Sequence, residues 1–263
     1  MSDDSDLSGS GSDDEPVESG PEEEEDRPVT AGHARVTKEQ KKAAAQWEAV
    51  FAEWPTERAK ALSRAERAER NMTHSSLVYG ETPFRAVWAA FDRLHALGEC
   101  TQGGGNFYDF GSGTGKATLA AVLAHDFHKC RGLEVLAQLH GASMEVLERW
   151  NATTHAALPP AKQRCDVRFL NQDIAATEWR DATFVFASCA CFNEQLMRTI
   201  AEKGEECRAG CIFVGVAKRI DDERHWELLD ESEHEMSWGP APVYIQRRRT
   251  AEEELGAALA PGS

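Results

Sequence analysis

Apolar residues along this chain follow two patterns, one typical of strands and one typical of helices. The alternation of these two kinds of segment predicts the class of fold. Runs of strand length lie at 106–110, 130–134, 166–170, 182–187 and 210–217. Segments with the apolar spacing of a helix lie at 84–97, 116–126, 136–150 and 193–206. Strands that alternate with helices in this way predict an α/β fold, with a mainly parallel sheet and helices on both faces.

The segment before this region has a purely helical pattern. Residues 36–71 are rich in Ala, Glu, Lys and Arg, and their aromatic residues have helical spacing. Because proline disrupts a helix interior, Pro55 predicts two helices, the second of them capped by Thr56. A further helix is expected to start at Thr82, with Pro83 as its first helical residue.

The C-terminal part departs from the alternation. We predict a short helix at 224–230, and then an extended run at 241–246 that pairs antiparallel with 210–217. The main domain is therefore expected to span 72–249, after the N-terminal helical segment, and 250–263 is expected to be a C-terminal tail.

The net charge of −16 comes mostly from one end of the chain. Residues 1–26 hold 12 acidic residues and no Lys or Arg, which leaves 33 acidic against 29 basic residues in the rest. A segment so acidic and so poor in apolar residues cannot bury a core, so we expect 1–35 to be a disordered acidic tail. Such a tail serves either solubility or contact with basic proteins such as histones.

The remaining bulk features exclude several classes of protein. No apolar run approaches the roughly 20 residues that cross a membrane, and no apolar segment follows the initiator Met, so we expect no secretory signal. Seven cysteines without a C-x-x-C pair indicate reduced thiols inside a cell. Cys189 and Cys191 lack the spacing of a zinc site, and we expect no metal.

A glycine-rich loop follows the first strand of the alternating region. Residues 109–115 read Asp-Phe-Gly-Ser-Gly-Thr-Gly, and a helical segment follows them. Glycines let a ligand approach the backbone, and the helix start offers free N–H groups. A P-loop is excluded, because Phe110 replaces its first glycine and Ala117 follows the lysine. The G-x-G-x-G spacing also differs from the dinucleotide fingerprint, and a tight turn without a ligand remains an alternative.

Polar residues end three later strands, where open α/β sheets bind their ligands. Glu134 is placed to accept from ribose hydroxyls, Asp173 from an adenine amino group beside Ile174, and Ser188 ends the fourth strand. This order suits nicotinamide cofactors as well as S-adenosylmethionine. The leading Asp109 favours S-adenosylmethionine, because a carboxylate suits a sulfonium and repels a diphosphate.

The ordered motifs resemble those of a known family, the Dot-type (non-SET) histone-lysine methyltransferases, especially its compact protist members. The motifs are Tyr-Gly-Glu-Thr at 79–82, the glycine loop, Gly-Leu-Glu at 132–134, Gln-Asp-Ile at 172–174, and the segments 184–192 and 236–244. The resemblance covers about residues 72–248. It implies a Rossmann-like class I methyltransferase fold with an antiparallel C-terminal finish, S-adenosylmethionine as cofactor, and no resident metal.

The resemblance also implies roles for individual residues. The expected cofactor-binding residues are Tyr79, Glu81, Thr82, Asp109, Gly111, Ser112, Gly113, Gly115, Lys116, Glu134, Asp173, Ile174 and Ser188. The expected catalytic and lysine-channel residues are Glu81, Ser188, Phe192, Trp238 and Tyr244, with Ile245 in place of Tyr244 if the register shifts by one residue. The chain departs from the family at Lys116, which is usually Gln there, and at Ser188, which is commonly Asn.

By this resemblance the chain transfers a methyl group to a deprotonated lysine of histone H3 in nucleosomes, as a monomer in the nucleus. A dry aromatic channel would lower the pKa of the incoming lysine. The nearly balanced charge of residues 27–263 predicts no strong sequence-specific binding of nucleic acid. The alternatives are a cytoplasmic location, a non-histone or small-molecule substrate, a nicotinamide oxidoreductase, and a cofactor-binding scaffold that has lost catalysis, since Ser188 replaces Asn.

Overall fold

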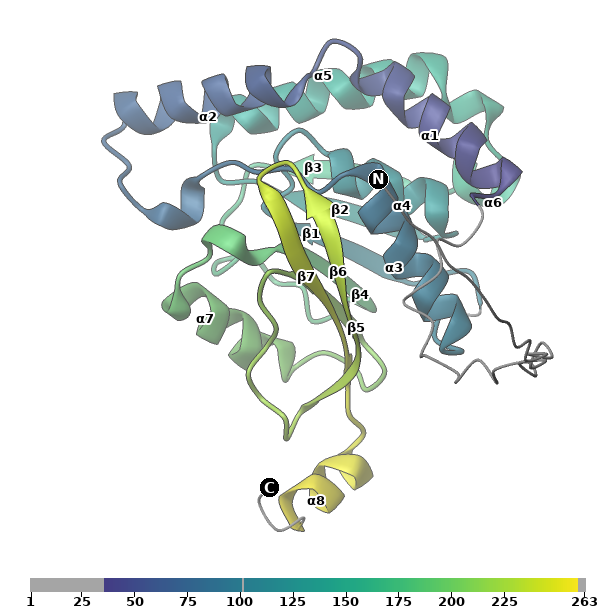
Figure 1. The fold of residues 1–263 in the computed structure, drawn as a ribbon, viewed down its shortest axis with the longest axis vertical. Coiled ribbons are helices and arrows are strands. Elements are labelled where there is room, and N and C mark those ends of the chain that lie inside the picture. Colours follow the sequence, from purple (N-terminus) through teal and green to yellow (C-terminus); the bar gives the residue numbers. More distant parts are fainter. Residues whose placement is uncertain (1–35, 101, 260–263) are drawn as a thin grey trace, which may run out of the picture. The chain divides into compact units, whose positions relative to one another are not determined.

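A seven-stranded sheet lies at the centre of the chain (Figure 1). The computed structural model describes residues 36–100 and 102–259, so the expected acidic tail 1–35 lies outside the described residues. The strands are β1 (Asn106–Phe110), β2 (Lys129–Leu133), β3 (Asp166–Leu170), β4 (Phe184–Ser188), β5 (Ile212–Val216), β6 (Trp226–Met236) and β7 (Gly239–Arg248). Their order across the sheet is β3-β2-β1-β4-β5-β7-β6.

The first five strands are parallel, and the last two are antiparallel; of these two, only the strand at 241–246 was expected from the sequence. β1 pairs with β2 and β4, β2 with β3, and β4 with β5, all in parallel register. β7 runs antiparallel to β5 and places Tyr244 opposite Gly215. β6 then pairs antiparallel with β7 and forms the edge of the sheet. The chain therefore has the Rossmann-like α/β fold, with the antiparallel C-terminal finish, that was predicted.

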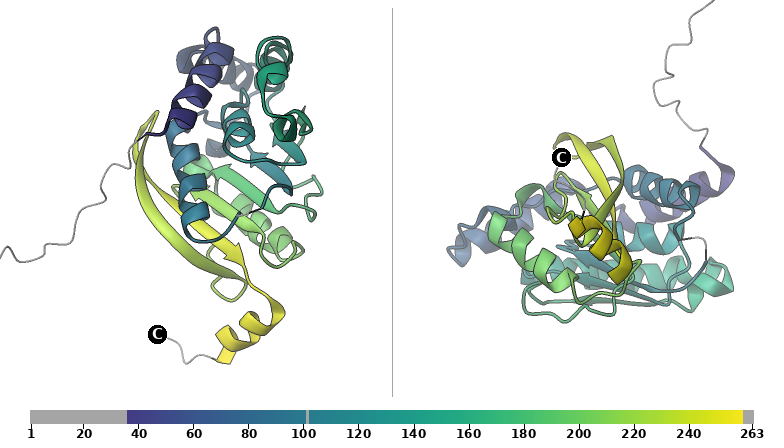
Figure 2. Two further views of the ribbon diagram at one scale, coloured as in Figure 1. Left: turned by 90° about the vertical axis from the view of Figure 1, so that its right-hand side faces the viewer. Right: turned by 90° about the horizontal axis from the view of Figure 1, so that it is seen from below.

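Helices cover the two faces of the sheet unequally (Figures 1 and 2). On one face lie α3 (Phe84–Ala96), α4 (Lys116–Ala124) and α5 (Ala137–Thr153), and they share a large apolar core with the sheet. α1 (Lys38–Phe51) and α2 (Thr56–Glu69) pack outside them, on α4 and α5. The other face is covered by α7 (Glu194–Gly204), through a second core that includes Trp179 and Trp226. Successive strand residues thus alternate between two buried cores.

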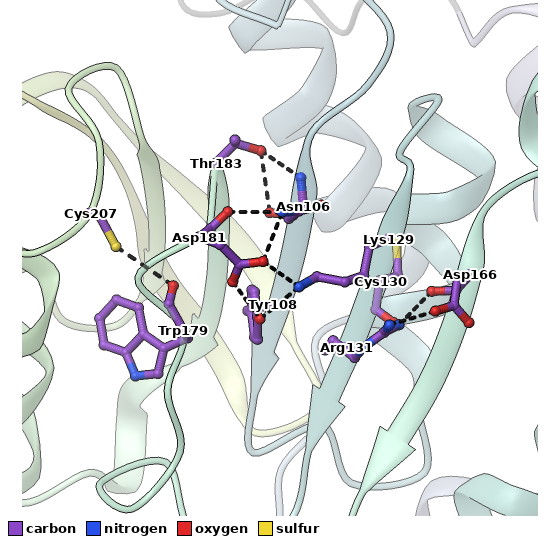
Figure 3. A network of polar contacts seen from close by, with 10 residues as sticks. All are labelled: Asn106, Tyr108, Lys129, Cys130, Arg131, Asp166, Trp179, Asp181, Thr183 and Cys207. Carbon is purple, nitrogen blue, oxygen red and sulfur yellow. Dashed lines mark hydrogen bonds and ion pairs between the residues drawn. The ribbon is translucent and has the colours of Figure 1, made fainter.

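The connection from β3 to β4 contains no regular helix, which leaves part of one sheet face without a helical cover. Polar side chains occupy this area instead (Figure 3). Asp181 accepts hydrogen bonds from Tyr108 Oη at 2.7 Å and from Lys129, and Arg131 pairs with Asp166 at 2.5 Å on the edge strand β3. Charged side chains of this kind protect an edge strand from pairing with another chain.

Two sequence expectations about local structure, the helix caps and one helix, are wrong. Pro55 and Pro83, not Thr56 and Thr82, are the N-caps of α2 and α3, because both prolines have extended backbone and the helix begins after them. The expected helix at 224–230 belongs to β6, whose pairing along β7 outweighs the helical preference of its Glu and Leu residues. The expected C-terminal tail carries a helix, α8 (Ala251–Leu259).

Two further properties follow from the described residues. All seven cysteines are free thiols, and the Sγ atoms of Cys130, in β2, and Cys165, just before β3, lie 3.5 Å apart in the same apolar core. Among residues 36–100 and 102–259, no helix combines the length and the apolar character that crossing a membrane requires.

Candidate active site

A cavity of about 600 Å³ lies at the carboxyl ends of the parallel strands. The residues predicted from sequence that line it are Tyr79, Gly111, Glu134, Asp173, Ile174, Ser188, Phe192 and Trp238. The sheet order explains why they meet, since Asp173 follows β3, Glu134 follows β2, Gly111 follows β1 and Ser188 ends β4. The volume is that of a site for a small molecule of cofactor size.

The glycine loop turns sharply from β1 into α4. Gly111, Gly113 and Gly115 have φ values of +74°, +54° and +90°, in the left-handed region that glycine tolerates best. A Cβ atom at Gly113 would lie 2.4 Å from Cε2 of Tyr79, so the Tyr79 ring packs directly on the loop. A Cβ atom at Gly115 would lie 2.3 Å from Phe169. The loop therefore needs glycine for its conformation and for its close neighbours.

Glu134 is a buried carboxylate at the edge of the cavity. Its Oε2 accepts a hydrogen bond from the backbone N–H of Gly113 at 2.9 Å, and its Oε1 accepts one from Leu136 at 2.8 Å. Burial raises the pKa of Glu134 to about 7, although the backbone donors oppose this shift. The side chain thus holds the glycine loop against the start of α5 and presents an acid to the cavity.

Asp109 is placed differently from the sequence expectation. It does not line the cavity, and its Oδ2 accepts a hydrogen bond from Thr118 Oγ1 of α4 at 2.7 Å. The side chain is 2% exposed, and burial raises the pKa of Asp109 to about 7 despite the Thr118 hydroxyl. The carboxylate therefore supports the glycine loop from behind and does not face the space that a ligand would occupy.

Other expected cofactor residues also lie behind the cavity wall. Glu81, Thr82, Ser112, Gly113, Gly115 and Lys116 do not line the cavity. Glu81 and Lys116 instead form a buried ion pair, with Nζ 2.7 Å from Oε2. Tyr79 donates to Glu81 Oε1 at 2.8 Å, and burial together with the Glu81 charge raises the pKa of Tyr79 well above its ordinary value. Of Tyr79, Glu81 and Lys116, it is Tyr79 that lines the cavity.

Two aromatic side chains line the part of the cavity next to Gly111 and Gly80, which we call the aromatic end. Phe192 is buried, and its backbone carbonyl accepts a hydrogen bond from Lys218 Nζ. Trp238, in the turn between β6 and β7, is 40% exposed and covers Gly80, where a Cβ atom would lie 2.7 Å from the indole ring. Ser188 ends β4, the neighbour of β1, and the Phe192 ring lies 3.6 Å from where a Cβ atom of Gly111 would be.

Tyr244 is not brought to this site. It is half-buried in β7 and does not line the cavity, and the alternative Ile245 lies in the core on the opposite face of that strand. Successive side chains of a strand point to opposite faces, and here neither face of β7 opens into the cavity at these two positions. The β6–β7 hairpin contributes to the cavity lining through Trp238, which lies in the turn between the two strands.

Several lining residues were missed by sequence reasoning. They include Met72, Leu77, Leu136, Leu139, Cys191 and Leu196. Leu136 and Leu139 follow Glu134 into α5, so their position after a strand-end acid was an available signal. Leu77 lies in the short helix η1 (Ser75–Leu77), and Cys191 lies in η3 (Cys189–Cys191); no periodic pattern marks either segment.

Comparison with known proteins assigns the family. Residues 60–237 match the family described as histone methylation protein DOT1. The chain belongs to this family. It is accordingly an S-adenosylmethionine-dependent methyltransferase, as its Tyr-Gly-Glu-Thr motif, glycine loop and strand-end acids predicted. The match omits α1, which lies before residue 60.

Solved methyltransferase structures are similar only distantly to this DOT1-family chain. Magnesium protoporphyrin IX methyltransferase of Synechocystis PCC 6803, determined with bound S-adenosylmethionine, is 12% identical, with 78% of this chain and 90% of that chain covered and a TM-score of 0.49. A putative RNA methyltransferase from Pyrococcus horikoshii is 14% identical, with coverage of 74% and 98% and a TM-score of 0.47. Neither carries an argument about function. Among curated proteins, none matches this sequence.

The residues present fit the cofactor of the DOT1 family. Glu134 offers a carboxylate at the cavity edge, and apolar side chains of Ile174, Leu136 and Leu139 line the wall beside it. Asp173 lies exposed next to Ile174, where its Oδ1 accepts from the N–H of Ala175 at 2.8 Å. A mostly apolar wall with a few placed acceptors is the usual composition of a nucleoside site.

Proposed function

We propose that this DOT1-family methyltransferase methylates a lysine of histone H3 in nucleosomes. The observation that carries the proposal is the aromatic end of the cavity, where Phe192 and Trp238 line a space next to Gly111 and Ser188. With Trp238 40% exposed, this end is accessible to a side chain from another molecule. The proposal also rests on the family, whose description is histone methylation.

The side chains at the two ends of the cavity favour an amine as the acceptor of the methyl group. Of the described residues that line the cavity, only Glu134 and Asp173 carry carboxylates, and both follow strands on the β2–β3 side. The aromatic end disfavours a charged ammonium by desolvation, and so lowers the pKa of an entering lysine. The aromatic faces also attract the methylated ammonium product. The chain therefore needs no general base at this end.

The proposed roles on the cofactor side follow from placement. Glu134 would hold the ribose hydroxyls, Asp173 and Ile174 the adenine, and Tyr79 and Gly111 the methionine part. When bound, S-adenosylmethionine supplies a methyl group on a positively charged sulfur. Ser188 retains a hydroxyl where the family commonly has Asn, and we propose that it lies beside the point of transfer. Asp109, Ser112, Gly113 and Gly115 would act by shaping the loop.

Surface charge supports a basic protein as acceptor. Glu231, Glu233 and Glu235 alternate along the exposed face of the edge strand β6, which leads directly to Trp238. Arg247 pairs with Glu227 at 2.5 Å and with Glu253 at 3.0 Å, so it is not free to bind phosphate. These glutamates beside the aromatic end of the cavity suit lysine- and arginine-rich histone segments better than DNA. A nuclear location follows from such a substrate.

The experiment that tests this function uses labelled S-adenosylmethionine with intact nucleosomes, free histones and a cell lysate. Label on histone H3 is the expected result, with more label on nucleosomes than on free histones. Label confined to non-histone material would overturn the histone assignment. Saturable binding of the cofactor without transfer to any acceptor would favour the scaffold alternative, for which the Ser188 substitution is the motivating feature.

A further inference from the structure

A buried polar cluster lies behind the glycine loop and joins segments that are distant in sequence. The Glu81 carboxylate is its centre and belongs to a residue that is 8% exposed. Oε2 accepts from Lys116 Nζ at 2.7 Å and from Thr56 Oγ1, and Oε1 accepts from Tyr79 Oη at 2.8 Å. Three donors from three segments thus fix the position of one carboxylate.

The N-terminal helices supply part of this cluster. Thr56 is the first residue of α2, and Trp47 of α1 donates through Nε1 to the backbone carbonyl of Lys116 at 2.9 Å. Lys116 Nζ lies 5.8 Å from the Trp47 ring and 5.7 Å from the Phe51 ring, within the range of cation–π attraction. α1 therefore packs against Lys116, and α2 bonds to its partner Glu81, although Trp47, Phe51 and Thr56 lie outside the family match.

Tyr79 connects the cluster to the cavity. Its hydroxyl donates to Glu81 and lies 3.3 Å from Thr114 Oγ1, while its ring packs on Gly113 and lines the cavity. The backbone of Glu81 also pairs with Ser237, through Glu81 N–H to Ser237 Oγ at 2.9 Å and Ser237 N–H to Glu81 O at 3.2 Å. Any shift of Glu81 therefore moves the residues that face the ligand.

We propose that Thr56, Lys116 and Glu81 are positioning residues that hold Tyr79 against the glycine loop, so that α1 and α2 form part of the cofactor site. None of the three lines the cavity, so they act on the cofactor through Tyr79. Lys116 replaces the family's usual Gln and balances the buried charge of Glu81, and Thr56 completes the set of donors. The inference concerns the methyl donor alone and is independent of the acceptor.

The test is a set of calorimetric titrations of S-adenosylmethionine into the full chain. Thr56→Val removes one donor to the Glu81 carboxylate at nearly constant volume, and affinity should fall by about tenfold, since hydrogen bonds to charged groups are the stronger ones. Thr56→Ser keeps the hydroxyl and should restore the affinity. Thr153→Val removes a hydroxyl that contacts only Arg149 and the adjacent Thr154, at the end of α5, and should leave the affinity unchanged.

A double-mutant comparison separates positioning from general loosening of α2. In a Tyr79→Phe background the hydroxyl that Glu81 holds is absent, so Thr56→Val should change the affinity by less than about twofold. Independent effects that multiply in the double variant would overturn the proposal. Unchanged affinity in Thr56→Val alone, measured on protein with a wild-type unfolding temperature, would overturn it as well.

Discussion

The two halves of the cavity are built in different ways. The cofactor half consists of glycines and acids that follow adjacent parallel strands, so each lies within a few residues of a strand end. The acceptor half consists of η3, α7 and the turn between β6 and β7, which are held by contacts from distant segments, such as Lys218 to Phe192 and Glu81 to Ser237. The first half is determined by local sequence, whereas the second depends on how distant segments pack.

This difference predicts that substitutions in the two halves have separable effects. A change in the glycine loop should act on affinity for the methyl donor, and a change in the aromatic end should act on transfer to the acceptor.

Gly113→Ala should have the largest effect, because the added methyl would lie 2.4 Å from Tyr79 at a φ of +54°. Backbone strain and steric overlap together amount to about 3 kcal/mol, so affinity for S-adenosylmethionine should fall about a hundredfold in a calorimetric titration. Gly98→Ala is the matched control, because φ there is +80° but no atom lies within 4 Å. It should lower stability and leave affinity unchanged; equal losses of affinity would contradict the account.

Trp238→Ala should act on the other half. Loss of the aromatic wall is expected to lower kcat/KM for nucleosomes by about thirtyfold, roughly 2 kcal/mol, while the Kd of S-adenosylmethionine changes by less than about twofold. Leu228→Ala is a control with similar exposure, 39% against 40%, on the same hairpin. A loss of cofactor affinity as large as the loss of transfer would show that the halves do not act separately.

Glu134→Gln tests the charge of the cofactor half. Burial raises the pKa of Glu134 to about 7, and the ionised form accepts best from ribose hydroxyls. Affinity for S-adenosylmethionine should therefore rise by up to about tenfold between about pH 6 and about pH 8. The glutamine variant should bind about tenfold more weakly at the higher pH and lose most of this slope. An unchanged slope would assign the titration to another group.

Asp109→Asn should have the smallest effect, on stability. Burial raises the pKa of Asp109 to about 7, above the value near 3.9 of an unfolded chain. The folded state thus holds more protons between these values, so its contribution to stability is present at low pH and is lost as the pH rises through about 7. The variant should be more stable than wild type by about 1 kcal/mol at about pH 8, with no gain near pH 4. Denaturant titrations measure this, and a gain that is larger at low pH would contradict the burial argument.

The sequence predicted the cofactor half well because its signals are local. Alternation of apolar runs located β1 to β5 to within two residues, and the strand-end positions of Glu134 and Asp173 brought both into the cavity lining. The loop glycines could be recognised by spacing alone. Asp109 is one of seven expected cofactor residues outside the lining; its hydrogen bond to Thr118 turns it toward α4, and the spacing of the motif does not encode that direction.

The two N-terminal helices were predicted, but their contacts and those of the acceptor half could not be. β6 has a composition suited to a helix and becomes a strand only through its ladder with β7. The bonds from Thr56 to Glu81 and from Trp47 to Lys116 join positions 25 and 69 residues apart. Such contacts arise from tertiary packing, which overrides local preference. No residue spacing in a single sequence predicts them.

Mapping of the methylated positions shows whether the chain methylates a histone lysine. Recombinant nucleosomes are incubated with S-adenosylmethionine and either the wild-type chain or Trp238→Ala, and the histones are then analysed by mass spectrometry. The account predicts methylation at a lysine of histone H3 by the wild-type chain, at least about tenfold reduced with the variant. Wild-type protein that binds the cofactor yet leaves every histone unmethylated would contradict it.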